Sequence, residues 1–176
     1  MAATSDSVTT VVKEFMRLIQ GTTSLSSAIT VKRAKYSVDD PPDRIENRVF
    51  IGGNYALMPI LRKIEDVVRN HGFQPIIARD FDIPKDKTRD YTLRLLFQCR
   101  YAIFEETVGD GQLAEVVRTS GFGEIRMLQV YMAIDELKEP PKTMSVMVWQ
   151  TKPPPQGYLT IEELREIVKT FLSEIK

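Results

Sequence analysis

The sequence has very few of the residues that build disulfides, zinc sites or histidine-based catalytic centres. Among its 176 residues there is one cysteine, Cys99, so an internal disulfide and a cysteine-rich zinc site are both excluded. There is also one histidine, His71, which any Ser-His-Asp or Cys-His centre would have to use. Any catalytic chemistry is therefore expected to rest on carboxylates.

The sequence also lacks an excess of either charge and any long apolar run. Its 24 Lys and Arg residues balance 24 Asp and Glu residues, which argues against a dedicated nucleic-acid-binding protein. No run approaches the 18 or so apolar residues of a membrane span, and the N-terminus has no basic segment and apolar core typical of a signal peptide. With 43% hydrophobic residues, the chain is expected to be a globular, cytoplasmic protein with one sizeable core.

Residues 1–47 differ in pattern from the rest and are predicted to form a separate N-terminal part. Residues 29–36 could be an edge strand or an extended arm, and residues 39–43, with two prolines and three acids, are typical of a linker. Apolar side chains at helical spacing predict a preceding amphipathic helix, and these are Val8, Val11, Val12, Phe15 and Ile19. We place the α/β domain at residues 48–176.

From Arg48 onward, short apolar runs alternate with helical patterns. Strands are predicted near residues 49–51, 73–78, 101–104, 127–133 and 157–160, while residues 144–149 could be a strand or a helical turn. The alternation predicts a parallel sheet of about five strands with helices on both faces.

The helices of this domain carry recognisable start and stop signals. A helix after Asn54 has Pro59 in its first turn and Gly72 at its end. The next helix, capped by Asp86 or Thr88, is expected to turn Leu95, Leu96 and Cys99 inward. A short helix follows Gly111 with Leu113, Val116 and Val117 on its buried face, and Thr160 with Glu163 forms a capping box for the last helix.

Ligands of such sheets bind at the carboxyl ends of the strands, near the point where the strand order reverses. This rule selects three loops, at residues 52–54, 79–82 and 105–112. In the third loop, Asp110 can cap a helix on which Gln112 and Glu115 share the face left free by the apolar residues. The helix dipole favours an ionised Glu115, which could stabilise an oxocarbenium-like transition state or attack an anomeric carbon. The alternative is an ordinary exposed glutamate.

Other polar residues at these strand ends could contact a ligand or serve the fold alone. Backbone amides of Gly52, Gly53 and Asn54 could hold a phosphate or a ribose hydroxyl, or the three residues could form a plain tight turn. Arg79, Asp80 and Asp82 could bind a base or ribose, or serve the turn, with Asp82 as a cap. Asp90 could orient a ligand or pair with Arg94. No metal site is expected here, because the Asp80 and Asp82 pair alone provides too few ligands.

Three segments of the sequence resemble the TIR-like and nucleoside 2-deoxyribosyltransferase-like superfamily. They are VFIGGNY at 49–55, GFQPIIARDFD at 72–82 and RYAIFEETVGDGQLAEV at 100–116, and the resemblance covers about residues 48–175. It implies a flavodoxin-like three-layer fold whose nucleotide pocket lies between the glycine-rich first loop and the helix after the third strand. It also implies that Glu115 is the catalytic residue that cleaves an N-glycosidic bond of NAD or a nucleoside.

The resemblance adds further residues to the expected ligand site. It also distinguishes deoxyribosyltransferases from NAD-cleaving or nucleotide-binding relatives. Residues 144–147 are similar to the superfamily's Ser-Ser-Met element, which packs near the site from the same chain or from a partner in a homo-oligomer. The expected ligand-binding set thus also includes Gly109, Asp110, Gly111, Gln112, Ser145 and Met147. Deoxyribosyltransferases have E-x-G-x-A where this chain has Glu115-Val-Val-Arg-Thr119, so an NAD-cleaving or nucleotide-binding relative is favoured.

Two further classes of function stay open beside an N-glycosidase or N-glycosyltransferase. One is a non-catalytic nucleotide sensor that uses the same pocket. The other is a self-assembling interaction module with residues 1–20 as a docking helix. No cofactor is expected in any of these, because NAD or the nucleoside is itself the substrate or ligand.

Overall fold

The computed structural model describes residues 45–108, 125–133 and 154–176. The five strands are β1 (Ile45–Gly53), β2 (Gln74–Ile76), β3 (Cys99–Glu105), β4 (Arg126–Met132) and β5 (Gln156–Tyr158). The α-helices are α2 (Met58–Asn70), α3 (Thr88–Phe97) and α5 (Ile161–Glu174), with short 3-10 turns η1 (Tyr55–Leu57), η2 (Ala78–Asp80) and η3 (Lys85–Lys87). Of the N-terminal part expected over residues 1–47, residues 1–44 lie outside the described residues, and residues 45–47 belong to β1. Residues 144–149 also lie outside the described residues.

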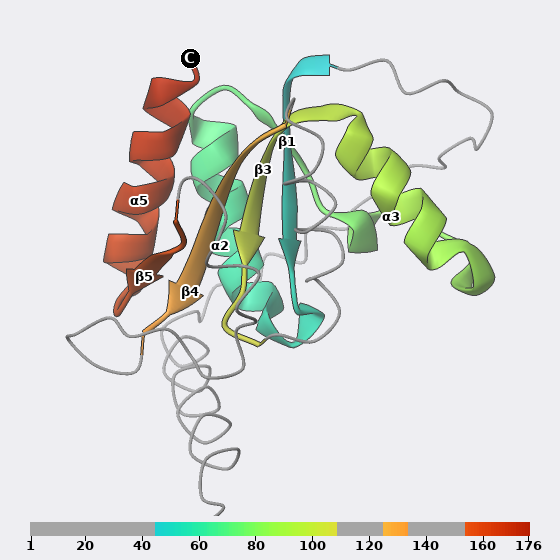
Figure 1. Ribbon diagram of the computed structural model, residues 1–176, viewed down its shortest axis with the longest axis horizontal. Helices are drawn as coiled ribbons and strands as arrows, with labels where there is room; N and C mark the ends of the chain where they lie inside the picture. Colours follow the sequence, from blue (N-terminus) through green and yellow to red (C-terminus); the bar gives the residue numbers. More distant parts are fainter. Residues whose placement is uncertain (1–44, 109–124, 134–153) are drawn as a thin grey trace, which may run out of the picture. The chain divides into compact units, whose positions relative to one another are not determined.

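The five strands form one sheet in the order β2-β1-β3-β4-β5, and every neighbouring pair is parallel (Figure 1). This is the flavodoxin-like order, so the expected fold class is confirmed. The pairing register aligns the strand ends, because Gly53 lies beside Glu105, Glu105 beside Val130, and Met132 beside Tyr158. The carboxyl ends of four strands therefore meet at one edge.

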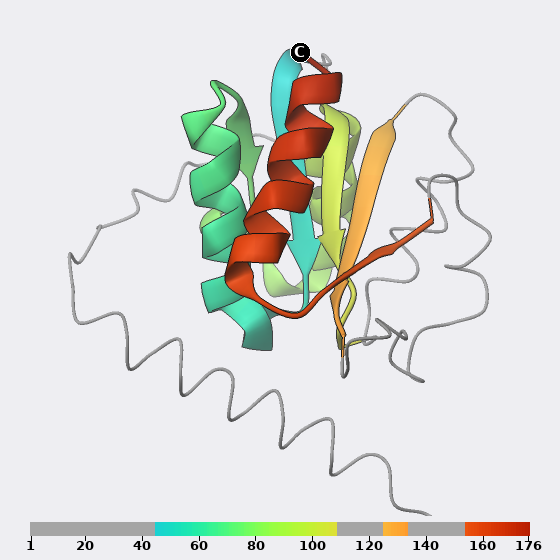
Figure 2. The same cartoon turned by 90° about the vertical axis from the view of Figure 1, so that its left-hand side faces the viewer.

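Helices cover both faces of the sheet, as the strand–helix alternation predicts. Helices α2 and α5 pack against each other on one face, and α3 lies on the opposite face (Figure 2). Alternate residues of β1 and β3 supply the two cores, since side chains of a strand point to opposite faces in turn. On the α3 side the buried cluster includes Phe50, Ala102, Phe104, Leu95, Leu96 and Met127.

Helices α2 and α5 form as their sequence signals predict. The apolar stripe of α2 and the preceding turn is buried, at Leu57, Ile60, Leu61, Ile64 and Val68. Pro59 lies in the first turn of α2, and Gly72 follows its end at φ +86°, in the left-handed region that favours glycine. At the start of α5, Thr160 Oγ1 accepts a hydrogen bond from Glu163 N at 3.1 Å, and Glu163 Oε2 accepts one from Leu159 N at 2.9 Å.

The structure corrects three local expectations. Gly52 and Gly53 belong to β1 rather than to a loop, because both continue the pairing with β3. Cys99 begins β3 rather than ending the preceding helix, since it pairs with Ile45. Asp86 lies within η3, and the Thr88 hydroxyl donates back to the carbonyls of Pro84 and Lys85, so no cap of the expected kind forms.

Candidate functional site

The strand order reverses between β1 and β3, which places the switch point of the sheet at the ends of these two strands. In open parallel sheets this crevice is where ligands bind. Gly53 and Glu105 are neighbours across the two strands, and the described chain continues beyond this strand end to Val108. The expected ligand edge and the observed switch point therefore coincide.

Gly52 and Gly53 are glycines because neighbouring side chains occupy the space that a Cβ atom would need. A Cβ at Gly52 would lie 2.5 Å from Cδ1 of Phe104, and one at Gly53 would meet the side chain of Leu61. The two residues form regular strand, so the expected tight turn is wrong. Their contact with a phosphate or ribose stays a prediction, and their packing role explains both glycines.

Asn54 fixes the backbone that leaves β1. Its side-chain oxygen accepts a hydrogen bond from Ala56 N at 2.9 Å and so caps the η1 turn. The side chain is half-buried, and Tyr55, the next residue, is exposed. The turn thus presents the Tyr55 ring at the carboxyl edge of the sheet.

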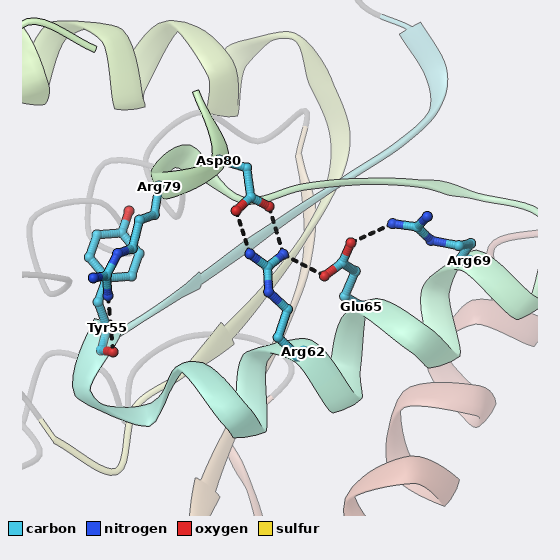
Figure 3. A network of polar contacts seen from close by, with 6 residues as sticks. All are labelled: Tyr55, Arg62, Glu65, Arg69, Arg79 and Asp80. Atoms are coloured by element: carbon cyan, nitrogen blue, oxygen red, sulfur yellow. Dashed lines mark hydrogen bonds and ion pairs between the residues drawn. The ribbon is translucent and has the colours of Figure 1, made fainter. Parts of the chain in front are cut away.

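Arg79, Asp80 and Asp82 follow β2, but the structure gives them different partners. Both carboxylate oxygens of Asp80 accept hydrogen bonds from Arg62 of α2, one of them at 2.7 Å (Figure 3). Arg79 lies over the ring of Tyr55, and Asp82 is exposed. Asp90 is exposed in the first turn of α3, where the helix dipole favours an acidic side chain. Contact of these four residues with a ligand stays a prediction.

The remaining predicted site residues lie outside the described residues. They are Gly109, Asp110, Gly111, Gln112, Glu115, Ser145 and Met147. The chemical role of Glu115 thus stays a prediction from the sequence. Among the described residues, no group of three metal-ligating side chains occurs.

Cys99 is not a nucleophile candidate in this fold. Its side chain is fully buried and its thiol donates a hydrogen bond to the Leu95 carbonyl at 3.2 Å. Burial raises the pKa of the Cys99 thiol to about 12. The reactive thiolate is therefore scarce at neutral pH.

A buried hydrogen-bond network at the carboxyl ends of β3, β4 and β5 is a feature that the sequence analysis did not single out. Glu105 Oε1 accepts hydrogen bonds from the Thr107 hydroxyl and, at 3.0 Å, from the Tyr158 hydroxyl. Thr107 Oγ1 in turn accepts one from Met132 N at 2.7 Å. The network therefore ties three strand ends together next to the switch point.

The Glu105 carboxyl is costly to ionise in this position. It is completely buried, and its second oxygen, Oε2, has no hydrogen-bond partner in the described part of the chain. Burial raises the pKa of Glu105 to about 7, although hydrogen bonds from Thr107 and Tyr158 favour the ionised form. The carboxyl is thus partly ionised at neutral pH, but with no exposed surface it cannot itself touch a ligand.

One signal could have identified Glu105. An acidic residue directly follows the apolar run Tyr101–Phe104, at the end of a central strand that the ligand rule selects. Which polar groups would meet it depends on the register of β4 and β5, and the sequence does not specify that register.

Replacing Tyr158 by phenylalanine is expected to destabilise the protein more at pH 8 than at pH 5. The change removes a donor to Glu105 Oε1, and hydrogen bonds to ionised groups contribute about 1.5 to 3 kcal/mol against about 1 kcal/mol for neutral pairs. Urea unfolding at both pH values measures the difference.

Tyr101→Phe is the matched control, because the Tyr101 hydroxyl donates to the Ile175 carbonyl at 3.3 Å, outside the network. Its effect should be the same at both pH values. Equal losses for Tyr158→Phe at pH 5 and pH 8 would contradict the assigned hydrogen bond.

Among the described residues, no helix is both long enough and apolar enough to cross a lipid bilayer.

No protein-family model and no curated protein matches this sequence. Among solved structures, the fold is similar to a metazoan TIR-STING receptor from C. gigas in complex with 2',3'-cGAMP, with a TM-score of 0.49 and 12% sequence identity. The match covers 74% of this chain and 41% of that chain, so this chain spans less than half the length of the receptor. The fold class rests on the observed strand order and pairing, and a relationship to the deoxyribosyltransferases is not shown.

Proposed function

We propose that this protein binds a nucleotide or nucleoside at the carboxyl edge of its sheet and cleaves or transfers the N-glycosidic bond, with Glu115 as the catalytic carboxylate. The strand order carries the proposal, because it reverses between β1 and β3, and Glu115 follows β3 in the sequence. The resemblance of residues 49–55, 72–82 and 100–116 to nucleotide-binding α/β domains supports the same ligand class.

The proposed reaction breaks the bond between the anomeric carbon and the base. The electron pair of this bond leaves with the base, and water or an acceptor base supplies the new bond to the sugar. Glu115 stabilises the oxocarbenium-like transition state or attacks the anomeric carbon. With NAD and water the products are nicotinamide, ADP-ribose and the proton that the attacking water releases.

The test is incubation of the full chain with NAD and, separately, with deoxynucleosides, followed by chromatography for free base. Glu115→Gln is expected to slow base release by about a hundredfold or more, because it removes the negative charge that stabilises the developing cation. Glu166→Gln is the matched control, since Glu166 lies exposed on α5 and forms an ion pair with Lys169.

Equal base release by the wild type and the Glu115→Gln variant would contradict the role of Glu115. Binding without release of base would instead favour a nucleotide sensor. Such a sensor should gain about 2.7 kcal/mol of stability at a ligand concentration one hundred times the dissociation constant.

A further inference from the structure

Tyr55 and Arg79 form an exposed pair at the carboxyl edge of the sheet, just after β1 and β2. The Cζ atom of Arg79 lies 5.6 Å from the centroid of the Tyr55 ring, and Arg79 Nη1 lies 3.5 Å from the Tyr55 carbonyl oxygen. Tyr55 is 39% exposed and is the one exposed large hydrophobic residue in the described part of the chain. Figure 3 shows the guanidinium against the ring.

The backbone on both sides of this pair is held by specific contacts. Asn54 caps the turn that carries Tyr55. On the other side, Arg62 of α2 binds both oxygens of Asp80, the residue after Arg79, and also donates to Glu65 at 2.6 Å (Figure 3). These contacts fix η1 and η2 relative to each other, so Tyr55 and Arg79 are positioned before any ligand binds.

Arg79 and Arg62 carry the same charge but contact different partners. Arg62 is shared by two carboxylates, and the hydrogen bond to Asp80 raises its pKa above the ordinary value for arginine. Among the residues that the structure describes, the partners of Arg79 are an aromatic ring and a backbone carbonyl, and both are neutral. The exposed guanidinium can therefore still bind an anion.

We infer that Tyr55 and Arg79 form a recognition platform for a nucleoside phosphate. This inference rests on the proposed function and specifies its ligand class. A planar base extends the stack of ring and guanidinium, since aromatic side chains and arginine both stack on bases. The guanidinium N–H groups bind the phosphate, because their planar fork matches phosphate oxygens. Arg62 and Asp80 act as positioning residues.

The experiment measures binding of AMP, adenosine and ribose 5-phosphate to the full chain by calorimetry. Arg79→Gln should weaken the binding of AMP and of ribose 5-phosphate by about tenfold or more. It should change adenosine binding by less than about threefold. Tyr55→Ala should weaken AMP and adenosine by about tenfold and leave ribose 5-phosphate nearly unchanged. Tyr55→Phe should retain binding, because the ring persists.

Arg89→Gln is the matched control, since Arg89 is also exposed but belongs to α3. Asp80→Asn should weaken AMP binding by a few fold, whereas Tyr55→Phe should not. This comparison separates the positioning role of Asp80 from stacking on the ring of Tyr55. The inference is overturned if the wild type does not bind AMP, if Arg79→Gln weakens AMP and adenosine equally, or if Tyr55→Ala binds AMP as the wild type does.

Failure of this inference and failure of the proposed reaction give different results. If AMP binding depends on Tyr55 and Arg79 but NAD and deoxynucleosides are not cleaved, the platform stands and the reaction fails. If base is released with a KM that neither Tyr55→Ala nor Arg79→Gln changes, the reaction stands and the platform fails.

Discussion

Raising the pH from 5 to 8 is expected to lower the free energy of unfolding by about 2 to 3 kcal/mol through Glu105 alone. Each unit of pKa difference between the folded and unfolded states corresponds to about 1.4 kcal/mol. Burial raises the pKa of Glu105 from 4.5 to about 7 in the folded protein. The window of the effect therefore lies between these two values.

The sign of this dependence is opposite to that of a salt-bridged carboxylate. Between pH 4.5 and 7 the folded state keeps the proton on Glu105, whereas the unfolded chain has released it. Because the folded state binds more protons in this range, stability falls as the pH rises. Below the unfolded pKa the contribution is fully present, and above pH 7 it is lost.

Urea unfolding at intervals between pH 5 and pH 8, with Glu105→Gln beside the wild type, measures the effect. Glutamine keeps an oxygen that accepts from Thr107 and Tyr158 but cannot ionise. The two proteins should be similar in stability at pH 5, and the variant should be the more stable one at pH 8. Two parallel stability curves would contradict the assignment.

The exposed Glu166→Gln variant controls for a general effect of removing one negative charge. Glu166 is 70% exposed, so its loss should leave the difference from the wild type nearly constant over the same pH range. Because Glu105 has no exposed surface, Glu105→Gln should change the stability at pH 8 without changing the nucleotide affinity.

The periodic parts of the sequence predicted the fold, because their patterns reflect local geometry. The apolar stripe that includes Ile60, Leu61 and Ile64 identified α2, and Thr160 with Glu163 identified the start of α5. The alternation of strands and helices predicted a parallel sheet with both faces covered. These signals need no knowledge of distant contacts.

The details of the candidate site could not be predicted in the same way, because they depend on tertiary contacts. Asp80 follows a strand and resembles a ligand residue, yet its partner Arg62 lies 18 positions earlier on a helix. Glu105 and Tyr158 are 53 positions apart and meet through the register of three strands. Spacing along the chain carries no signal for either contact.

Gly52 shows why a motif can be assigned to the wrong feature. Glycine often ends strands and starts turns, so the pair at positions 52 and 53 was expected to form a loop near a ligand. The observed reason for glycine at position 52 is the ring of Phe104, which lies 52 positions later in the sequence. The packing role and the ligand role of Gly52 lead to different experimental results.

Gly52→Ala is expected to destabilise the protein by about 3 kcal/mol, the upper part of the range for overpacked cores. The new Cβ would lie 2.5 Å from Cδ1 and 2.7 Å from Cε1 of Phe104, and 3.2 Å from Cε1 of Phe50. Both rings are almost completely buried and pack against each other with centroids 5.9 Å apart, so neither can move freely. Thermal and urea unfolding measure the loss.

Gly53→Ala is the comparison, because its new Cβ would meet the end of the Leu61 side chain, which can change rotamer more easily than a ring. Its destabilisation should therefore be smaller than that of Gly52→Ala.

Phe104→Leu provides space beside position 52 and should recover part of the loss in the double variant with Gly52→Ala. Residues in contact commonly show such coupling, with energies of about 0.5 to 3 kcal/mol. If Gly52 served only to let its backbone amide contact a ligand, the pattern would be the opposite. Gly52→Ala would then leave stability unchanged and weaken AMP binding. That pattern would contradict the packing role, because a Cβ at this position has no room unless the Phe104 ring moves.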